Sequence, residues 1–374
     1  MRLAVFGLTV SSSWGNGHAT LWRALIRALA ERGHQVTFFE RNVPYYADHR
    51  DLVELPWGTL VLYDAWNPRR ALQVLAETDA AIVTSYCPDA EAAVAAMEQA
   101  DALRVFYDLD TPVTLARLDT GERVDYVPAG GLGRFNLVLS YAGGPALAAL
   151  ERRLGARATA ALPGFVDADA YRPGRPERWL RCDLSHLGTY AADRLAGLRE
   201  LFLVPGERRP SLRLLLAGAL YPPDVAARPG LRTVPHLSPA RHPALYASSR
   251  WTINVTRGPM AAMGHCPSGR LFEGAACEAA IVTDVWPGLE EFFTAGEEIV
   301  TAAGCDEVLA ALDMPPRRRR RIAEAARARV LAGHTARHRA AALERLLSWA
   351  RANQALTTRD PAGGPTPADG VAAS

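Results

Sequence analysis

The sequence predicts an α/β protein made of two Rossmann-like domains, each a doubly wound parallel sheet, which face each other across a cleft. Three observations support this prediction. The chain has 374 residues, more than the roughly 250–300 residues at which a single hydrophobic core stops growing. Short apolar runs alternate with helical patterns, which is typical of a parallel sheet covered on both faces. This alternation occurs twice, and a Pro- and Gly-rich stretch over residues 163–176 separates the two series.

The first series begins with the short apolar run of residues 3–6, which predicts a buried strand. A helix is predicted over Thr20–Arg32, because Leu21, Leu25 and Leu29 recur at a spacing of four residues. The other elements expected here are strands at 35–39, 80–84, 103–107 and 137–140 and a helix at about 89–99.

The second series begins near residue 183 and predicts a similar sheet. Its expected strands lie at 186–188, 212–216, 231–234, 251–255 and 280–283, with helices at 193–202, 268–277, about 316–332 and 335–354. The Thr-, Pro-, Gly- and Ala-rich tail is expected to be disordered. We therefore expect an N-terminal acceptor-side domain (1–165), a C-terminal nucleotide-sugar domain (166–334), a closing helix that packs back on the first domain (335–354) and a disordered tail (355–374).

Composition narrows the class of protein. A net charge of +2 gives no general argument for nucleic-acid binding. The five cysteines form no C-x-x-C pair, and their wide spacing argues against a zinc site or a disulfide framework. The first apolar run is too short for a signal peptide, and no stretch reaches the ~18 apolar residues of a membrane span. We expect a cytoplasmic protein with at most peripheral membrane contact, and the high Ala and Arg content indicates a bacterial source.

The first motif that could bind a ligand or take part in catalysis is the loop Ser11–Thr20, which follows the first strand. Gly15 and Gly17 would let the backbone approach a ligand, and the next helix presents free N–H groups. The motif is not G-x-G-x-x-G, because Thr20 stands at the third glycine position. His18 is a candidate donor to a sugar hydroxyl or an acid or base. The alternatives are an ordinary flexible loop and a structural histidine.

Two carboxylates follow the strand at 103–107. Asp108 and Asp110 leave the end of a buried strand, where doubly wound sheets bind ligands. They could bind hydroxyl groups of a sugar or an acceptor. The alternative is that Asp110 caps the next helix.

The third motif opens the helix predicted at 268–277. Ser268 stands at its start, and Arg270 and Glu273 lie three residues apart on one face. A helix N-terminus with a guanidinium group can bind a diphosphate, and a carboxylate further along can hold a ribose diol. The alternative, an exposed ion pair, is less favoured because small residues surround the pair.

A family resemblance becomes specific at this motif. Arg270-Leu271-Phe272-Glu273 with Ala276-Cys277, followed by residues 281–293, resembles the C-terminal signature of spore-maturation-type (CgeB-like) glycosyltransferases, within the retaining GT-B group. The loop at 12–18 with Glu40-Arg41 resembles the N-terminal half of such sequences. Further matching segments are Leu187–Tyr190, Asp193-Arg194, Asn254–Arg257 and the closing helix, so the resemblance spans about residues 1–350.

The resemblance implies a nucleotide-sugar donor, carrying UDP, GDP or dTDP, in the cleft between the domains. Glu273 matches the ribose-binding glutamate of the family, whereas His265 stands where many relatives have a sugar-contacting glutamate. Cations aimed at the leaving diphosphate would stabilise the charge that develops on it, and the candidates are Arg194, Arg257 and Arg270. Gly188 and Tyr190 are expected to line the donor site together with Gly15, Gly17, Ser268 and Glu273.

No carboxylate pair is placed for a metal or for double displacement. Asp108-x-Asp110 falls in the acceptor-side domain, so we expect metal-independent catalysis without a further cofactor, and front-face attack with retention. The acceptor, a small molecule, glycan or protein, is not identified by the sequence. The competing interpretations are a sugar-nucleotide epimerase or hydrolase on the same fold, and a silent nucleotide-sugar-binding or assembly protein. The run Arg317–Arg321 is either a solvated helix face or a contact for an anionic partner.

Overall fold

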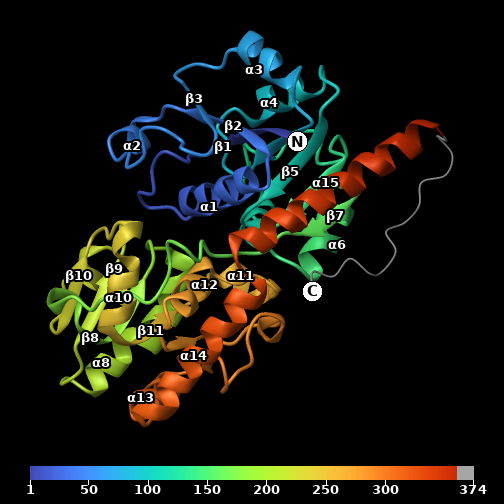
Figure 1. Cartoon of the computed structure of the whole chain (residues 1–374). Coiled ribbons are helices and arrows are strands. Elements are labelled where there is room, and N and C mark those ends of the chain that lie inside the picture. Colours follow the sequence, from blue (N-terminus) through green and yellow to red (C-terminus); the bar gives the residue numbers. More distant parts are fainter. Residues whose placement is uncertain (360–374) are drawn as a thin grey trace. The chain divides into compact units, whose positions relative to one another are not determined.

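The computed structural model describes residues 1–359, and they divide into two compact units (Figure 1). The first unit comprises Met1–Ser12, His18–Pro163 and the chain from Arg337 onward. The second comprises Ser13–Gly17 and Gly164–Ala336.

The first unit is built on a seven-stranded sheet whose neighbouring strands are all parallel. Its strand order is β3-β2-β1-β4-β5-β6-β7. The strands are β1 (Arg2–Gly7), β2 (Gln35–Arg41), β3 (Thr59–Tyr63), β4 (Ala80–Thr84), β5 (Leu103–Asp108), β6 (Leu137–Ser140) and β7 (Thr159–Ala161). The helices are α1 (His18–Glu31), α2 (Pro44–Ala47), α3 (Pro68–Leu75), α4 (Ala90–Met97), α5 (Thr111–Asp119) and α6 (Pro145–Leu154).

Helix α1 shows why these residues form these elements. Its apolar stripe buries Trp22, Leu25 and Leu29 against the sheet, as its four-residue spacing predicts. The chain then turns at Gly33, whose φ of +81° favours glycine. Strand β3 was absent from the prediction, although residues 60–63 form a short apolar run; it is an edge strand, and most of its side chains are only half-buried.

Helix α15 (Ala336–Arg359) belongs to the first unit from Arg337 onward. Arg32 donates to Glu344 at 2.8 Å from Nε, and Arg351 pairs with Asp79 at 3.2 Å. Arg339 is almost fully buried and donates from Nε to the carbonyl oxygen of Pro163 at 3.0 Å. The helix extends to Arg359, into the tail (355–374) that the sequence predicts as disordered; that prediction is not tested, and the residues after 359 lie outside the described part of the chain.

The second unit has a six-stranded sheet, again with parallel neighbours, in the order β10-β9-β8-β11-β12-β13. The strands are β8 (Cys182–Leu187), β9 (Leu214–Ala217), β10 (Leu231–Val234), β11 (Ser249–Asn254), β12 (Ile281–Thr283) and β13 (Val300–Thr301). The longer helices are α10 (His242–Ser248), α11 (Gly258–Met263), α12 (Gly269–Ala276), α13 (Cys305–Leu312) and α14 (Pro316–Gly333). Short pieces add η1 (Arg178–Leu180), α9 (Pro223–Ala226), η4 (Pro239–Arg241) and η5 (Leu289–Glu291).

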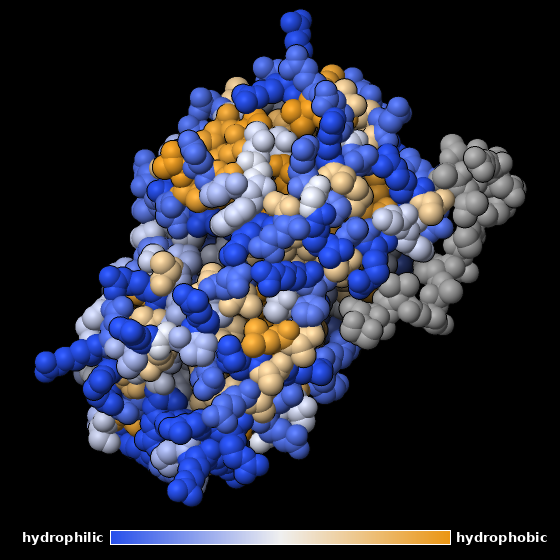
Figure 2. Space-filling view, in the orientation of Figure 1, coloured by the Kyte–Doolittle hydropathy of each residue, from blue (hydrophilic) through white to orange (hydrophobic). Residues whose placement is uncertain are grey.

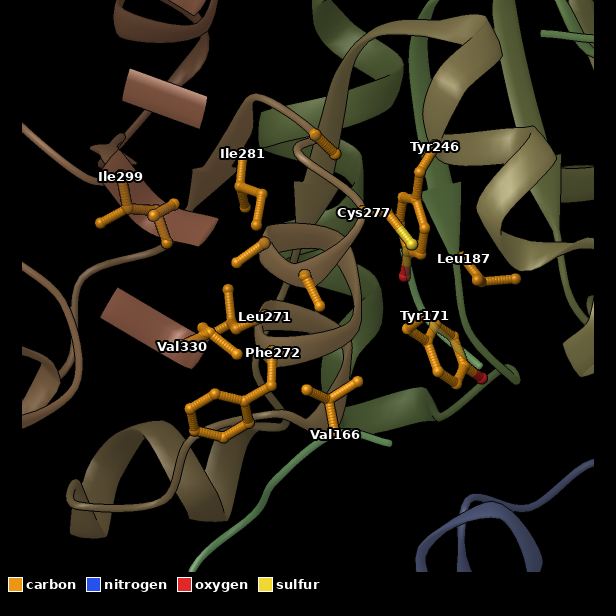
Figure 3. Packing of buried hydrophobic residues seen from close by; sticks show 14 of the residues in the cluster. Val166, Tyr171, Leu187, Tyr246, Leu271, Phe272, Cys277, Ile281, Ile299 and Val330 are labelled. Atoms are coloured by element: carbon orange, nitrogen blue, oxygen red, sulfur yellow. The ribbon is translucent and has the colours of Figure 1, made fainter. Parts of the chain in front are cut away.

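Helix α12 lies in the middle of one hydrophobic core of this unit (Figure 3). Leu271 and Phe272 are fully buried, and Leu271 lies beside Val330 of α14. On the other side, Cys277 lies against Tyr246 of α10. This packing fixes the first turn of α12, which carries several of the predicted site residues.

The helix predicted at 193–202 is present as one uninterrupted helical stretch, which consists of four successive pieces with different hydrogen-bond patterns. They are the 3₁₀ turn η2 (Ala192–Arg194), α7 (Leu195–Leu198), the π-helical η3 (Arg199–Leu203) and α8 (Val204–Arg208). The wider π turn lets Leu201, Phe202 and Leu203 all be buried, which the stripe of a regular surface helix does not allow.

The doubly wound fold class is confirmed, because the direction of strand addition reverses once in each sheet. The reversal lies between β1 and β4 in the first unit and between β8 and β11 in the second. Loops that leave neighbouring strands in opposite directions open a crevice at their carboxyl ends, and ligands of such sheets bind there. No helix among the described residues is long and apolar enough to cross a membrane.

Candidate functional site

In the second unit, the reversal point between β8 and β11 gathers charged side chains from two loops. Asp193 and Arg194 follow β8, and Arg257 follows β11. The guanidinium group of Arg257 donates to Asp193 from NH2 at 2.8 Å and from Nε at 3.1 Å. This pair ties the two loops together at the place where the fold leaves room for a ligand.

Two glycines, Gly188 and Gly218, leave the backbone at this place uncovered by side chains. The amide of Gly188 donates to Ala217 at 2.9 Å. Gly218 has a φ of +155°, and a Cβ there would lie 1.8 Å from the carbonyl oxygen of Gly188. A Cβ on Gly188 would in turn lie 3.1 Å from NH1 of Arg194. Glycine is therefore required at residue 218 by a close approach of two chain segments.

Three buried polar atoms beside these glycines have no hydrogen-bond partner: His186 Nε2, Arg194 Nε and the Tyr221 hydroxyl. Native proteins pair almost all such atoms, so a ligand or water is expected to supply the missing partners here. Burial and the charge of Arg194 lower the pKa of His186 to about 3, which keeps the ring neutral. Its Nδ1 lies 3.1 Å from the Ile253 carbonyl oxygen and therefore carries the proton, so Nε2 is an acceptor.

Arg194 and Tyr190 complete this group. Arg194 NH1 donates to the Thr189 carbonyl oxygen at 3.0 Å, and burial lowers the pKa of Arg194. The rings of Tyr190 and Tyr221 meet edge to face with centroids 5.6 Å apart. The sequence analysis singled out Gly188, Tyr190 and Arg194, which the structure brings together. It missed His186 and Tyr221, because neither lies in a recognisable motif.

The start of α12 holds the second predicted group. Ser268 is the N-cap of the helix, and its hydroxyl accepts from the Arg270 amide at 3.3 Å. Arg270 pairs with Glu273, and its NH1 lies 3.2 Å from His242 Nδ1. Tyr171 donates its hydroxyl hydrogen to the same His242 nitrogen at 3.1 Å, since His242 Nε2 faces the Leu237 carbonyl oxygen. Arg270 and Glu273 are therefore part of a buried network and do not form the exposed ion pair that the sequence analysis considered as the alternative.

Glu273 is held ionised in this network. Burial raises the pKa of its carboxyl group, but the charge of Arg270 outweighs burial and lowers the pKa overall. Arg270 pairs with Oε2, and His242 Nδ1 lies 3.7 Å from the same oxygen. Oε1 is left for another donor, as a ribose diol would require.

His265, at the position of the glutamate that many relatives have, takes an unusual backbone conformation. Its φ is +50°, and its amide donates to the Pro287 carbonyl oxygen at 2.6 Å. Its Nδ1 lies 2.6 Å from Oε1 of Glu291, and Gly288 leaves room for the ring. A histidine–carboxylate pair therefore occupies this position.

In the first unit, His18 lies at the other reversal point. It is the first residue of α1, and its ring meets that of Tyr86, which follows β4, with centroids 5.5 Å apart. Burial lowers the pKa of His18, and the charge of Asp110 opposes this shift. Asp110 stands at the N-cap of α5, but its side chain makes no capping hydrogen bond. The alternative that Asp110 caps the helix is therefore correct for the position of the residue, but the capping hydrogen bond is not formed.

The glycine loop between β1 and α1 behaves differently from the prediction. Residues Ser13–Gly17 group with the second unit, where the ring of Trp14 lies 4.5 Å from that of His236. Gly15 has a φ of +64°, which favours glycine. A Cβ on Gly17 would meet nothing within 4 Å, so space does not require a glycine there.

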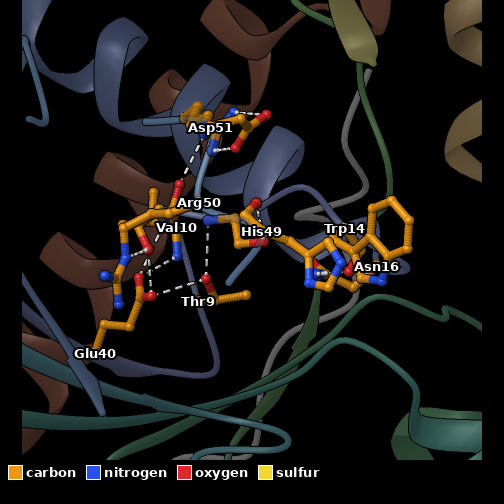
Figure 4. A network of polar contacts seen from close by, with 11 residues as sticks. Thr9, Val10, Trp14, Asn16, Glu40, His49, Arg50 and Asp51 are labelled. Carbon is orange, nitrogen blue, oxygen red and sulfur yellow. Dashed lines mark hydrogen bonds and ion pairs between the residues drawn. The ribbon is translucent and has the colours of Figure 1, made fainter. Parts of the chain in front are cut away.

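A buried carboxylate holds the start of this loop (Figure 4). Glu40, at the end of β2, accepts from the Val10 amide at 2.7 Å and from the Ser11 amide at 2.9 Å through Oε2. Its Oε1 accepts from the hydroxyls of Thr9 at 3.0 Å and Ser11 at 2.5 Å. The sequence analysis quoted Glu40 in the resemblance without giving it a role, because its donors lie about 30 residues away.

Two remaining predictions concern metal binding and the arginine run. Among the described residues no group of three or more His, Cys, Asp and Glu side chains could hold a metal ion, and metal-independent catalysis stays a prediction. Arg317–Arg321 lies at the start of α14, in a part of the second unit whose visible face is mostly hydrophilic (Figure 2). This fits the solvated helix face.

Residues 199–345 match the family model described as glycosyl transferase-like, whereas no protein of curated function matches significantly in sequence. Among solved structures, sucrose-phosphate synthase from Thermosynechococcus elongatus is similar, with a TM-score of 0.68 and 14% identity over 94% of this chain and 99% of that chain. HepE from Anabaena, solved with UDP-glucose, has a TM-score of 0.65 and 13% identity over 93% and 100%. An alpha-glucosyltransferase solved with UDP-glucose and DNA containing an abasic site has a TM-score of 0.65 and 11% identity over 93% and 99%.

These structures establish the GT-B fold. The family match over residues 199–345 supports the prediction of a glycosyltransferase enzyme. The CgeB-like subfamily stays a prediction.

Proposed function

We propose, from the glycosyl transferase-like domain and the GT-B fold, that this protein transfers a sugar from a UDP-sugar to a hydroxyl group of an acceptor. The observation that carries the proposal is the group of residues at the reversal point between β8 and β11. This place contains two glycines without side chains, two arginines and three buried polar atoms that have no hydrogen-bond partner. UDP is chosen over GDP and dTDP because two of the similar structures were solved with UDP-glucose.

In this proposal Arg194 and Arg257 bind the diphosphate. As the bond between the sugar and the diphosphate breaks, negative charge accumulates on the diphosphate oxygens, and fixed cations stabilise it. Arg194 is well suited because its guanidinium group is partly buried and its Nε is uncommitted. Arg257 is held in place by Asp193. Arginine stays charged and offers several donors in a fixed plane, which suits phosphate oxygens.

Glu273 is proposed to hold the ribose of the nucleotide through Oε1. Arg270 has a supporting role here, because it is bound to Glu273 and His242 and keeps the carboxylate ionised. Ser268 supports the same turn as its N-cap. These assignments change the expectation that Arg270 binds the diphosphate directly.

Retention by front-face attack and independence from metal ions are part of the proposal. The proposed function is tested in two steps. A thermal-shift screen against UDP-, GDP- and dTDP-sugars comes first. A turnover assay with UDP-glucose, UDP-galactose and UDP-N-acetylglucosamine then measures the release of UDP. EDTA is expected to leave the rate unchanged. Loss of the rate on chelation, restored by Mg²⁺ or Mn²⁺, would contradict metal independence, and a new glycoside of inverted configuration would contradict retention.

A second candidate function is a catalytically silent protein that binds a nucleotide-sugar. The observation that favours it is His265, paired with Glu291, at the place of the sugar-contacting glutamate of many relatives. The same assay separates the two functions. Binding of a UDP-sugar without release of UDP, with or without an acceptor, would favour the silent protein.

A further inference from the structure

A network of polar side chains joins the carboxyl ends of the neighbouring strands β11 and β12. Asn254 and Thr283 end these strands and are register partners, and Asn254 Nδ2 donates to the Thr283 hydroxyl at 3.0 Å. The Thr283 hydroxyl donates in turn to Oδ1 of Asp284 at 3.1 Å. Asn254 and Thr283 are buried, so water competes little for these bonds. We call Asn254, Thr256, Thr283 and Asp284 the β11/β12 network.

Within this network, Asp284 holds the chain segment that leaves β11. Both of its carboxylate oxygens accept from the Thr256 amide, at 3.0 Å for Oδ1 and at 3.1 Å for Oδ2. Oδ1 also accepts from the Thr256 hydroxyl at 2.9 Å. Hydrogen bonds to an ionised acceptor are stronger than those between neutral groups. Thr256 is buried, so water could not easily replace the carboxylate if it were removed.

Arg257 directly follows Thr256, and its backbone is therefore held from both sides. Asp284 fixes the Thr256 amide on one side, and on the other the Arg257 carbonyl oxygen accepts from the Ala261 amide of α11 at 2.9 Å. The guanidinium group of Arg257 reaches Asp193 in the loop after β8. Contacts thus run without a break from the end of β12, through the loop after β11, to the loop after β8.

This chain of contacts matters for an arginine that binds a diphosphate. Hydrogen bonds weaken steeply when their geometry is poor, so a guanidinium group on a loosely held loop stabilises phosphate oxygens less than one that is held in place. Asp284 itself is unsuited to touch a diphosphate, because like charges at close range repel. It also already accepts from three donor groups of Thr256 and Thr283. An effect of Asp284 on the donor must therefore pass through the loop that it holds.

We propose that Asp284 is a positioning residue for Arg257. It fixes the loop after β11 so that the guanidinium group of Arg257 meets the diphosphate of the donor. This inference rests on the proposed function, in which Arg257 binds that diphosphate. It adds a residue to which the sequence analysis gave no role.

A double-mutant cycle, read by calorimetric titration of UDP, tests the proposal. Arg257→Ala should weaken UDP binding at least tenfold, because a charged hydrogen bond to phosphate is lost. Asp284→Ala should weaken it about fivefold or more, as is usual for residues that share a network. Because Asp284 acts through Arg257, the double variant should bind UDP no more weakly than Arg257→Ala alone. Losses that multiply in the double variant would show an independent role for Asp284 and overturn the proposal.

A conservative variant and a matched control separate positioning from general destabilisation. In Asp284→Asn the amide oxygen can take the place of Oδ1, which receives all three donors, so UDP affinity should stay within about twofold of the wild type. Asp183→Ala is the control, because Asp183 also binds a backbone amide, that of Arg213 at 3.0 Å, but at the amino end of β8. It should lower the melting temperature and leave UDP affinity unchanged. Equal losses of affinity in Asp183→Ala and Asp284→Ala would overturn the proposal, and so would an asparagine variant as weak as the alanine variant.

The NMR signal of the Arg257 Nε–Hε group separates this inference from the proposed function, because it needs no ligand. It reports the bond from Nε to Asp193, which is 3.1 Å long, and its absence in Arg257→Ala assigns it. The signal should be the same in the wild type and Asp284→Asn, and should shift and broaden in Asp284→Ala. This change in a protein that binds no UDP would contradict the proposed function and leave the positioning role standing. UDP binding with an unchanged signal in Asp284→Ala would contradict the positioning role alone.

Discussion

Replacement of Glu40 tests how the loop after β1 is held. Its two carboxylate oxygens accept from four donors: two amides through Oε2 and two hydroxyls through Oε1. In Glu40→Gln the amide oxygen can still face the two backbone amides. The new NH₂ group would face hydroxyls, which can rotate to accept from it. In Glu40→Ala all four donors lose their acceptor inside a fully buried site.

The two variants should therefore differ in magnitude. A hydrogen bond to a charged group contributes about 1.5–3 kcal/mol and one to a neutral group about 0.5–1.5 kcal/mol, so two weakened amide bonds in Glu40→Gln cost roughly 2 kcal/mol. Each buried amide left unpaired in Glu40→Ala costs about 1–3 kcal/mol, and the packing of the side chain is lost as well. We expect a total of about 4 kcal/mol or more for Glu40→Ala.

Urea unfolding followed by circular dichroism measures both variants. Glu77→Gln is the matched control, because Glu77 pairs with Arg2 on the surface, where both side chains are more than half exposed. It should change stability by no more than about 0.5 kcal/mol. Equal losses for Glu40→Gln and Glu40→Ala would refute the hydrogen-bond reasoning. A Glu40→Ala variant as stable as the control would show that the network does not hold the loop.

Three further predictions concern single side chains. Glu273→Gln should weaken UDP binding at least tenfold in calorimetry, because a neutral amide bonds the ribose less strongly; unchanged affinity would remove Glu273 from the ribose site. Gly218→Ala should lower both the melting temperature and the UDP affinity, because its Cβ would lie 1.8 Å from the Gly188 carbonyl oxygen. Gly230→Ala shares the positive φ without the clash and should cost much less; equal losses would contradict the steric argument. Asp108 has a pKa raised from 3.8 to about 6 by burial, so the stability that its protonated form contributes is full below pH 4 and is lost as the pH rises through 6. Asp108→Asn should reduce the fall in melting temperature between pH 4 and pH 7, and an unchanged pH profile would contradict the assignment.

Much of the fold could be predicted from the sequence, because parallel strands buried on both faces leave continuous apolar runs. Strand β10 lies at the predicted residues 231–234, and β4 at 80–84. Strand β3 was missed although residues 60–63 form a short apolar run, and it is an edge strand whose side chains are mostly half-buried. The helix at 193–202 was predicted, but its π turn follows from no residue pattern.

The candidate site was predictable where the chemistry is local in sequence. Arg270 and Glu273 lie one helical turn apart, so their spacing alone places them together. His242 and Tyr171 reach the same network from 28 and 99 residues away and could not be recognised. His186 ends a strand and looks like a core residue until the structure shows that its Nε2 has no partner. The pairing of His18 with Asp110 likewise depends on the order of strands in the sheet.

Calorimetric titration of UDP into the wild type and Arg194→Ala tests whether the residues at the β8/β11 reversal bind the diphosphate of a nucleotide-sugar. Arg199→Ala is the control, because Arg199 is an exposed arginine five residues further along the same segment. UDP should bind the wild type and Arg199→Ala equally. It should bind Arg194→Ala at least tenfold more weakly, because a hydrogen bond from a charged group to phosphate contributes about 1.5–3 kcal/mol. Equal affinity of all three proteins for UDP, or no binding of UDP to the wild type, would contradict it.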